Sequence, residues 1–341
     1  MKSKLSYYYE MYRKAHLLRM APKIWNYAKY RCLPRKARMS VRRYTPQICS
    51  LLLTKRCNLD CGYCNVAKIL REGRNNGSEN EATFEKVQRI FDNPLFANCL
   101  LVDLGGGEPL LVSDLNRIIS FLSKRGHMVN ISTNGLLLAD HIVDLKRAGI
   151  SRINVSIYDA NWPVIKRDIA KINRIFSVHT SMVLTRSKVE KEQDKLFEMI
   201  CFIRNAGCRS LRFWIYRPMG INPQPEEIID DTLPAYIEFR QRMEEVLPGF
   251  CLWPATLQTG RVEKRCPQLW QRIGCDVVGK MAICCGIDTT LQGPNSNLFS
   301  SNPDAIFNNP TLVAMREKLL DPESDPPEVC KTCNLLGDPG W

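Results

Sequence analysis

The sequence lacks the features of an exported or membrane-spanning protein. No uninterrupted apolar run in its 341 residues approaches the roughly 18 residues of a transmembrane span. The N-terminal stretch has neither a compact apolar region nor a cleavage site of small residues, so we expect no signal peptide. Internal repeats and low-complexity tracts are absent as well. The composition, 45% hydrophobic and 24% charged, indicates a folded globular chain with one large domain or a large and a small one.

Acidic residues are nearly absent from residues 1–45, which hold 13 Lys or Arg and only Glu10. The rest of the chain has 35 basic and 34 acidic residues, so +12 of the net charge of +13 belongs to this arm. The near-neutral body predicts no nucleic-acid partner. Apolar residues at helical spacing predict a pair of amphipathic helices divided at Pro22. Three alternatives remain for the arm: contact with an anionic membrane surface, packing on the body with its charges offered to an anionic substrate, or a solvated basic face.

Histidine is scarce, with four residues at no metal-binding spacing, whereas cysteine is frequent and odd in number at 15. Without a signal peptide, we do not expect a disulfide framework. We expect reduced thiols, some of which are metal ligands. We therefore expect a cytoplasmic protein. The basic arm leaves open a peripheral position at the inner membrane surface.

Short apolar runs alternate with helical patterns from residue 46 to residue 248, which predicts an α/β domain with a parallel sheet. Six such units predict a partial (β/α)6 barrel, two short of a closed one. The expected strands are Ile48–Leu53, Cys99–Leu104, Met128–Ser132, Ile153–Ile157, Ser181–Thr185 and Leu211–Ile215. The expected helices are Ala82–Phe91, Ser113–Lys124, Ala139–Ala148, Pro163–Ile175, Lys188–Ala206 and Pro234–Val246.

The alternation stops after Pro248, and residues 249–341 are rich in Cys, Pro, Asn and Asp. Gly279-Lys280 between two apolar runs predicts a small hairpin, and a helix is expected at Pro310–Leu320. These residues form a small module with too few apolar side chains to fold unaided, so we expect a bound metal group to stabilise it.

The most specific motif is a group of three cysteines, Cys57, Cys61 and Cys64, directly after the first expected strand. Ligand sites in parallel α/β folds lie at the carboxyl ends of the strands. Three thiolates can hold three irons of a [4Fe–4S] cluster and leave the fourth iron open to a small molecule. The alternative, a structural zinc site, usually needs a fourth Cys or His, and none is nearby.

A second motif, Gly105-Gly106-Gly107-Glu108-Pro109, follows the second expected strand. Glycines allow close approach of the backbone to a ligand, and a carboxylate can accept hydrogen bonds from an ammonium group. The carboxyl ends of neighbouring parallel strands lie side by side, so this motif is expected close to the three cysteines and supports a ligand site there.

With these two motifs the chain resembles the radical S-adenosylmethionine (SAM) superfamily over about residues 47–220. The resemblance implies that Cys57, Cys61 and Cys64 hold a [4Fe–4S] cluster and that SAM binds its open iron. It implies reductive cleavage of SAM by an external one-electron reductant of the flavodoxin or ferredoxin type, which gives a 5′-deoxyadenosyl radical. The residues that it implies as cofactor contacts are Tyr63, Gly106, Gly107, Glu108, Ser132, Asn134, Ser156 and Arg186. Further candidates at the end of the sixth strand are Tyr216, Arg217 and Met219.

A second cysteine set lies in the C-terminal module: Cys266, Cys284, Cys330 and Cys333. Four thiolates can hold either zinc or a cluster without an open iron, and Cys275 and Cys285 are alternative ligands in the same region. The module resembles the twitch form of the SPASM extension of radical SAM enzymes. This resemblance implies one auxiliary [4Fe–4S] cluster.

The resemblance also implies hydrogen abstraction from a substrate carbon. We expect an oxidoreductase or epimerase that dehydrogenates or epimerises a small molecule such as a sugar, cyclitol or glycolipid-like substrate. One alternative is a maturase of a ribosomally made peptide, although about 46 residues before the first strand are few for a peptide-recognition domain. The other alternative is a non-catalytic metal-binding protein tethered by its basic arm.

Overall fold

A computed structural model describes residues 17–32, 40–42, 45–62, 64, 81–218, 222–254, 256, 266–284, 290–331, 333 and 336. Its strands form one sheet in the order β7-β6-β5-β4-β3-β2-β1-β8-β9. All neighbouring strands are parallel except β8 and β9, which form an antiparallel hairpin. The strands are β1 (Ile48–Thr54), β2 (Leu101–Gly106), β3 (Met128–Thr133), β4 (Arg152–Ile157), β5 (His179–Leu184), β6 (Leu211–Ile215), β7 (Cys251–Leu252), β8 (Arg272–Asp276) and β9 (Met281–Ala282).

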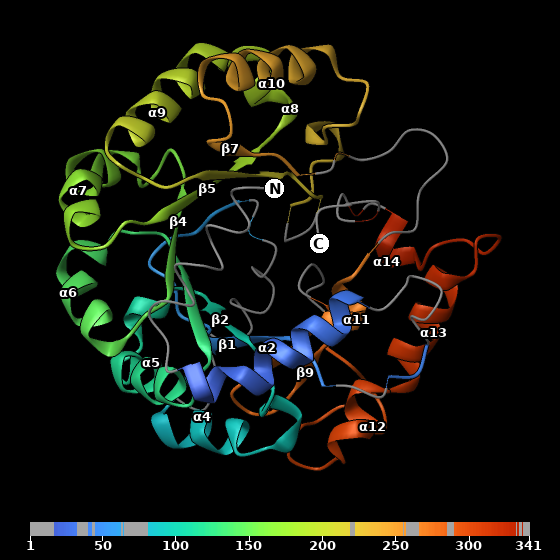
Figure 1. Cartoon of the computed structure of the whole chain (residues 1–341). Helices are drawn as coiled ribbons and strands as arrows, with labels where there is room; N and C mark the ends of the chain where they lie inside the picture. The colour runs from blue at the N-terminus through green and yellow to red at the C-terminus, as the bar shows by residue number, and fades with distance from the viewer. Residues whose placement is uncertain are drawn as a thin grey trace.

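The sheet curls into a partial barrel with its helices on the outside (Figure 1). Outward-facing strand residues such as Ile153, Val155 and Ile157 are fully buried beneath these helices, whereas the alternate residues on the inner face are partly exposed. The α/β fold and the parallel sheet of β1–β6 are thus confirmed. The helices are α2 (Leu17–Cys32), α4 (Phe84–Phe91), α5 (Leu115–Lys124), α6 (Leu138–Ala148), α7 (Trp162–Ile175), α8 (Arg186–Lys191), α9 (Gln193–Asn205), α10 (Pro234–Val246), α11 (Gln268–Gln271), α12 (Pro303–Phe307), α13 (Pro310–Leu320) and α14 (Glu328–Lys331).

The sheet does not end at residue 248, where the sequence pattern changes. β7 pairs with β6, and β8 pairs in parallel with β1, so the predicted hairpin around Gly279 extends the barrel sheet at its other edge. The side chains of Leu269, Ile273 and Leu319 belong to the same apolar core as the barrel. The C-terminal residues therefore gain apolar contacts from the barrel, and the division of the chain into domains stays a prediction.

A buried arginine joins the C-terminal helices to one another. Arg316 on α13 is fully buried, and its guanidinium donates hydrogen bonds to the carbonyl oxygens of Leu269 (2.9 Å), Phe307 (2.8 Å) and Ser40 (3.0 Å). Burial lowers its pKa to about 10. Because a buried cation needs hydrogen-bond partners, these carbonyls fix α13 relative to α11 and α12.

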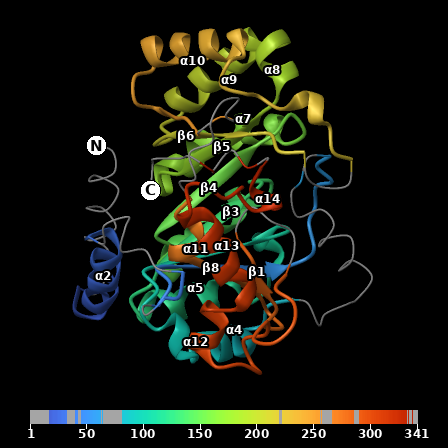
Figure 2. The same ribbon diagram turned by 90° about the vertical axis from the view of Figure 1, so that its right-hand side faces the viewer.

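Two expected helices differ from the structure. The stretch around Pro22 is a single helix, α2, that continues through the proline; it covers the end of the barrel where the strands begin, with Met20 packed on Leu100 and Met128 (Figure 2). The single helix expected at Lys188–Ala206 is divided into α8 and α9 at Glu192, whose backbone leaves the helical region (φ −127°). Among the helices described, none is both long and apolar enough to cross a membrane.

Candidate active site

The three cysteines of the first motif lie in the loop that follows β1. All three side chains are half-buried, and the Cys64 N–H donates to the Cys61 carbonyl (3.1 Å) in a tight turn. Burial, together with the neighbouring Cys64 and Cys57 thiols, raises the pKa of Cys61 to about 11. The three thiols are therefore close neighbours, as ligands of one group must be. Tyr63 lies outside the described residues.

The glycine-rich turn after β2 packs directly on this cysteine loop. The Gly107 N–H donates to the Thr54 carbonyl and the Glu108 N–H donates to the Arg56 carbonyl, both at 2.8 Å. A Cβ on Gly107 would lie 1.9 Å from the Arg56 carbonyl oxygen, and Gly106 adopts a positive φ of +123°. Only glycine allows this approach. The two motifs therefore form one unit in which the turn supports the chain segment that leads into Cys57.

Glu108 has a different environment from the one that its motif suggests. Its carboxylate is buried and accepts hydrogen bonds from the Leu110 N–H (3.0 Å), the Thr133 hydroxyl (2.7 Å) and the Asn134 N–H (2.8 Å). Burial raises its pKa, and these hydrogen bonds oppose that shift. Both oxygens already have donors within the protein, so the side chain joins the ends of β2 and β3. The backbone of the turn remains the part that could face a ligand.

Asn134, after β3, connects this unit to the cysteine loop. Its side-chain amide donates to Oδ1 of Asn58 (2.7 Å), which lies between Cys57 and Cys61. Asn161, which no sequence motif indicated, is fully buried and donates to the carbonyls of Asn134 (2.6 Å) and Ser156 (2.7 Å). A lone asparagine at the start of a helix gives no sequence signal for such a role. The ends of β3 and β4 thereby position the cysteine loop.

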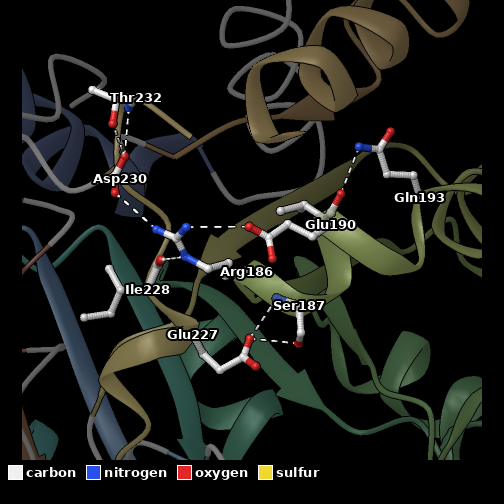
Figure 3. A network of polar contacts seen from close by, with 9 residues as sticks. Arg186, Ser187, Glu190, Gln193, Glu227, Ile228, Asp230 and Thr232 are labelled. Atoms are coloured by element: carbon white, nitrogen blue, oxygen red, sulfur yellow. Dashed lines mark hydrogen bonds and ion pairs between the residues drawn. The ribbon is translucent and has the colours of Figure 1, made fainter. Parts of the chain in front are cut away.

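Three further residues were predicted to contact SAM, and each has a different environment in the structure. Ser132 is exposed on the inner face of β3, and the Ser156 hydroxyl lies 3.4 Å from the Ser181 hydroxyl on β5. The guanidinium of Arg186, at the start of α8, instead forms ion pairs with Asp230 (3.4 Å) and Glu190 (3.6 Å) (Figure 3). A contact between Arg186 and SAM would have to compete with these carboxylates.

The candidates at the end of β6 also have distinct environments. Tyr216 is buried, and its hydroxyl accepts a hydrogen bond from the Gln224 N–H (2.9 Å), which is a structural role. Arg217 lies close enough to Cys330 to lower the pKa of that thiol, although burial and Cys333 raise it to about 11 overall. Arg217 therefore faces the second cysteine set. Met219 lies outside the described residues.

The second cysteine set comes from three parts of the C-terminal region. Cys266 and Cys284 are half-buried against the core, and the Cys333 N–H donates to the Cys330 carbonyl (3.0 Å). Cys275 is buried on β8 in contact with Cys49, whereas Cys285 lies outside the described residues. In the part of the chain that the structure describes, no three Cys, His, Asp or Glu side chains are arranged to hold a single metal ion. The auxiliary cluster stays a prediction.

The same finding covers Cys57, Cys61 and Cys64, so their role as cluster ligands also stays a prediction; the composition of the first cysteine loop is what a cluster with an open iron needs. Three neighbouring thiols come from one loop, and a glycine turn without side chains lies beside them. A hydrogen-bonded frame from Glu108, Asn134 and Asn161 holds this loop at the carboxyl ends of the strands.

Comparisons with known proteins agree with this arrangement. The family model "Radical SAM superfamily" matches residues 51–232. A probable GTP 3′,8-cyclase of Methanococcus maripaludis is 36% identical over 139 residues, which cover 40% of this chain and 45% of that protein. Its counterpart from Methanococcus vannielii is 32% identical over 207 residues, which cover 58% and 67%. The chain thus spans about half to two thirds of the length of these relatives.

A solved structure has a similar fold. Streptococcus suis SuiB bound to S-adenosylmethionine superposes with a TM-score of 0.62 over 84% of this chain and 77% of that one. The sequence identity is 14%, so the likeness concerns the fold alone.

Proposed function

The chain belongs to the radical SAM superfamily, and from this premise we propose that Cys57, Cys61 and Cys64 hold the SAM-binding [4Fe–4S] cluster of an enzyme that abstracts hydrogen from a small molecule. When bound, the cluster and SAM supply a 5′-deoxyadenosyl radical that removes a hydrogen atom from a substrate carbon. The observation that carries this proposal is the direct packing of the Gly107 turn on the cysteine loop.

The protein's own residues hold, orient and shield the reacting groups. The thiols of the cysteine loop would hold the cluster, and the backbone of Gly106 and Gly107, which packs on Thr54 and Arg56, would contact SAM. Asn134 and Asn161 fix the loop through hydrogen bonds. The barrel wall encloses the substrate and keeps bulk water away from a reactive radical.

We propose a substrate with a sugar-like ring, on which hydrogen abstraction leads to dehydrogenation or epimerisation. Dehydrogenation removes two electrons, and an auxiliary cluster on Cys266, Cys284, Cys330 and Cys333 could accept the second one. The relatives named GTP 3′,8-cyclase act, by their name, on a ribonucleotide, which also carries a sugar ring. Ring closure on a nucleotide is therefore the reaction most closely related to the dehydrogenation or epimerisation that we propose. An external one-electron reductant completes the scheme.

The two alternatives from the sequence have less support. A peptide maturase would share the fold, but fold likeness at 14% identity does not identify a substrate. A non-catalytic metal-binding protein would have no use for a cysteine loop with an open ligand position beside a glycine turn.

Iron and sulfide per chain test the proposal in anaerobically reconstituted protein. Wild type should hold about eight irons with two clusters, and a Cys57→Ala/Cys61→Ala/Cys64→Ala variant about four. Cys201→Ala, a half-buried thiol on α9, is the matched control and should hold the wild-type amount. An unchanged iron content in the triple variant would overturn the assignment of the cluster loop.

A further inference from the structure

A tryptophan is exposed on the inner face of the barrel, one residue before the carboxyl end of β6. Its chain neighbours Phe213 and Ile215 are buried, and the Phe213 ring packs against Phe239 of α10 on the outside of the sheet, with 6.2 Å between the ring centres. Because successive side chains of a strand point to opposite faces, the Trp214 side chain points into the barrel. The indole is 36% exposed although it lies on a concave wall. Ligand pockets are lined by aromatic side chains of this kind.

Trp214 belongs to a row of three side chains that crosses three neighbouring strands. Val183 of β5 is paired with Trp214 in the parallel register, so both side chains point to the same face. One strand further, Ser156 of β4 is paired with Ser181 of β5. Tyr158 follows Ser156 by two residues, and its hydroxyl is hydrogen-bonded to Ser156, which keeps the ring on the same face. Trp214, Val183 and Tyr158 therefore lie side by side on the inner wall at the carboxyl ends of their strands.

The Tyr158 end of this row lies next to the cysteine loop. Burial raises the pKa of Tyr158, its hydrogen bond opposes this rise, and the three thiols of the cysteine loop add to it. Electrostatic effects of this kind weaken with distance, so the Tyr158 hydroxyl lies close to the loop. Neighbouring strands are about 4.8 Å apart, which places Trp214 two strands, or about 10 Å, from Tyr158. The row thus leads from the place where a cluster would bind to the exposed indole.

The row offers flat and apolar surface with few polar groups. Its side chains carry two, the indole N–H of Trp214 and the Tyr158 hydroxyl, and the hydroxyl already has Ser156 as a hydrogen-bond partner. The several hydroxyls of a sugar placed on this surface would lose their contacts with water without gaining hydrogen bonds, which is unfavourable. A nucleobase instead stacks its flat face on an aromatic ring, and this stacking needs no hydrogen bond. The surface at Trp214 therefore suits a base better than a sugar.

We propose that Trp214 stacks against the base of a nucleoside or nucleotide substrate whose ribose lies toward Tyr158 and the cysteine loop. This inference deepens the proposed function and rests on it for the placement of the substrate inside the barrel. The two strand spacings between the indole and Tyr158 match the length of a nucleoside. A ribose carbon, and not the base, is then the position nearest the cysteine loop. The Arg212 guanidinium, 5.5 Å from the indole ring centre, helps to hold the ring in place.

Titration with nucleotides and with a ligand that lacks the base tests this stacking. Anaerobically reconstituted protein saturated with SAM is titrated by calorimetry with AMP, GMP, CMP, UMP and ribose 5-phosphate. Wild type should bind at least one of the four nucleotides at least about tenfold more tightly than ribose 5-phosphate, because only the nucleotides carry a base that stacks. Trp214→Leu, which keeps apolar bulk without an aromatic ring, should lose this preference. Trp214→Phe should keep most of it.

A second exposed tryptophan provides the matched control. Trp25 lies on α2, outside the barrel, and is 63% exposed, so Trp25→Leu should bind every ligand like wild type. Iron content and far-ultraviolet circular dichroism verify that the variants fold. The affinity for SAM, measured on the same proteins, should be equal in wild type and Trp214→Leu. A loss of SAM affinity in Trp214→Leu would assign the indole to the adenine of SAM and would overturn the proposal.

Two further results would overturn the proposal: a wild type that binds no nucleotide more tightly than ribose 5-phosphate, or an unchanged preference in Trp214→Leu. Should Trp214→Leu fail to fold, a wild-type crystal with the tightest-binding nucleotide decides, since its base must lie against the Trp214 ring or the proposal is wrong. Nucleotide binding requires no SAM cleavage. A failure here therefore leaves the proposed function intact, whereas absence of SAM cleavage in wild type would overturn the proposed function alone.

Discussion

The side-chain amide of Asn134 donates a hydrogen bond to Oδ1 of Asn58 over 2.7 Å, although 76 residues separate them in the sequence. This contact joins the end of β3 to the middle of the cysteine loop. The same Asn134 donates through its backbone N–H to Glu108 (2.8 Å). Three strand ends are thereby held together around the place where a cluster would bind, independently of any contact that Asn134 makes with SAM.

Removing this hydrogen bond should make the cluster easier to lose. Asn58→Ala and Asn134→Ala each remove a bond worth about 1 kcal/mol, so iron should be lost to a chelator roughly fivefold faster than from wild type. The double variant should be no worse than Asn134→Ala alone, because both substitutions remove the same contact, while Asn134→Ala also removes the hydrogen bond that its Oδ1 accepts from the Leu136 N–H (3.1 Å). Absorbance at about 400 nm follows the loss. Additive effects of the two substitutions would contradict a shared role, and Asn205→Ala on the surface is the control.

The glycine turn allows a sharp comparison between neighbouring residues. Gly107→Ala places a methyl group against the Arg56 carbonyl and should displace the cysteine loop, whereas Gly105→Ala meets nothing within 4 Å. We expect Gly107→Ala to lower the free energy of unfolding by about 1–3 kcal/mol and to bind little iron. Gly105→Ala should resemble wild type in both measurements. Normal iron content in Gly107→Ala would show that the loop does not depend on this approach.

A buried histidine makes stability depend on pH. Burial lowers the pKa of His127 to about 4, with Lys23 and Arg125 nearby, and its Nδ1 is 2.8 Å from the Cys99 carbonyl. The unfolded chain takes up a proton near pH 6.5 and the folded chain only near pH 4, so stability falls as pH decreases through this window. Below pH 4, His127 lowers the free energy of unfolding by about 3 kcal/mol relative to pH 7.

Urea unfolding at pH 7 and pH 5 measures this effect. His127→Asn should lose stability at pH 7, because the buried ring is gone, and should show a smaller difference between the two pH values than wild type. Part of the pH dependence should remain, because the pKa of His179 is lowered in the same direction. An identical pH dependence in wild type and variant would contradict the role of His127.

Contact with an anionic membrane remains a prediction from the basic arm. Helix α2 is fixed to the barrel by Lys23, which donates to the Ala97 carbonyl (2.7 Å), and it leaves Trp25 63% exposed beside Lys29. Flotation with vesicles rich in phosphatidylserine should carry wild type upward, and a chain without residues 1–16 should float at least severalfold less. Equal flotation would exclude a membrane role of residues 1–16, and no flotation of wild type would exclude a membrane role of the whole arm.

The strand pattern and the motif spacing predicted the six barrel strands and their shared edge. The shared edge was predictable because the carboxyl ends of consecutive parallel strands lie at one edge of a sheet and do not depend on which side chains pack together. The pairing of β8 with β1 was not predictable: Arg272 hydrogen-bonds to Ser50 across 222 residues, and a short apolar run does not specify its partner strand. The second strand was expected to end at Leu104, because glycines have low strand propensity. It continues to Gly106, because Gly105 and Gly106 pair with β1.

The ligands of the candidate site stay a prediction, and most of the hydrogen bonds that support the cysteine loop were not predicted. Cysteine spacing indicates metal chemistry directly, since thiolates bind iron at few spacings. Glu108 carries the right charge for an ammonium, yet neighbouring donors at Thr133 and Asn134 satisfy it, and only the folded chain brings them together. Asn161 had no sequence signal at all. Long-range hydrogen bonds of this kind depend on tertiary structure, which a local pattern does not contain.

We propose that the cysteine loop after β1 holds a cluster at which SAM is cleaved. Anaerobically reconstituted protein, reduced with dithionite and supplied with SAM, should form 5′-deoxyadenosine in amounts measurable by mass spectrometry. The Cys57→Ala/Cys61→Ala/Cys64→Ala variant should form none, while Cys201→Ala should match wild type. Absence of 5′-deoxyadenosine from wild type with a full iron content, or equal formation by the triple variant, would contradict the account.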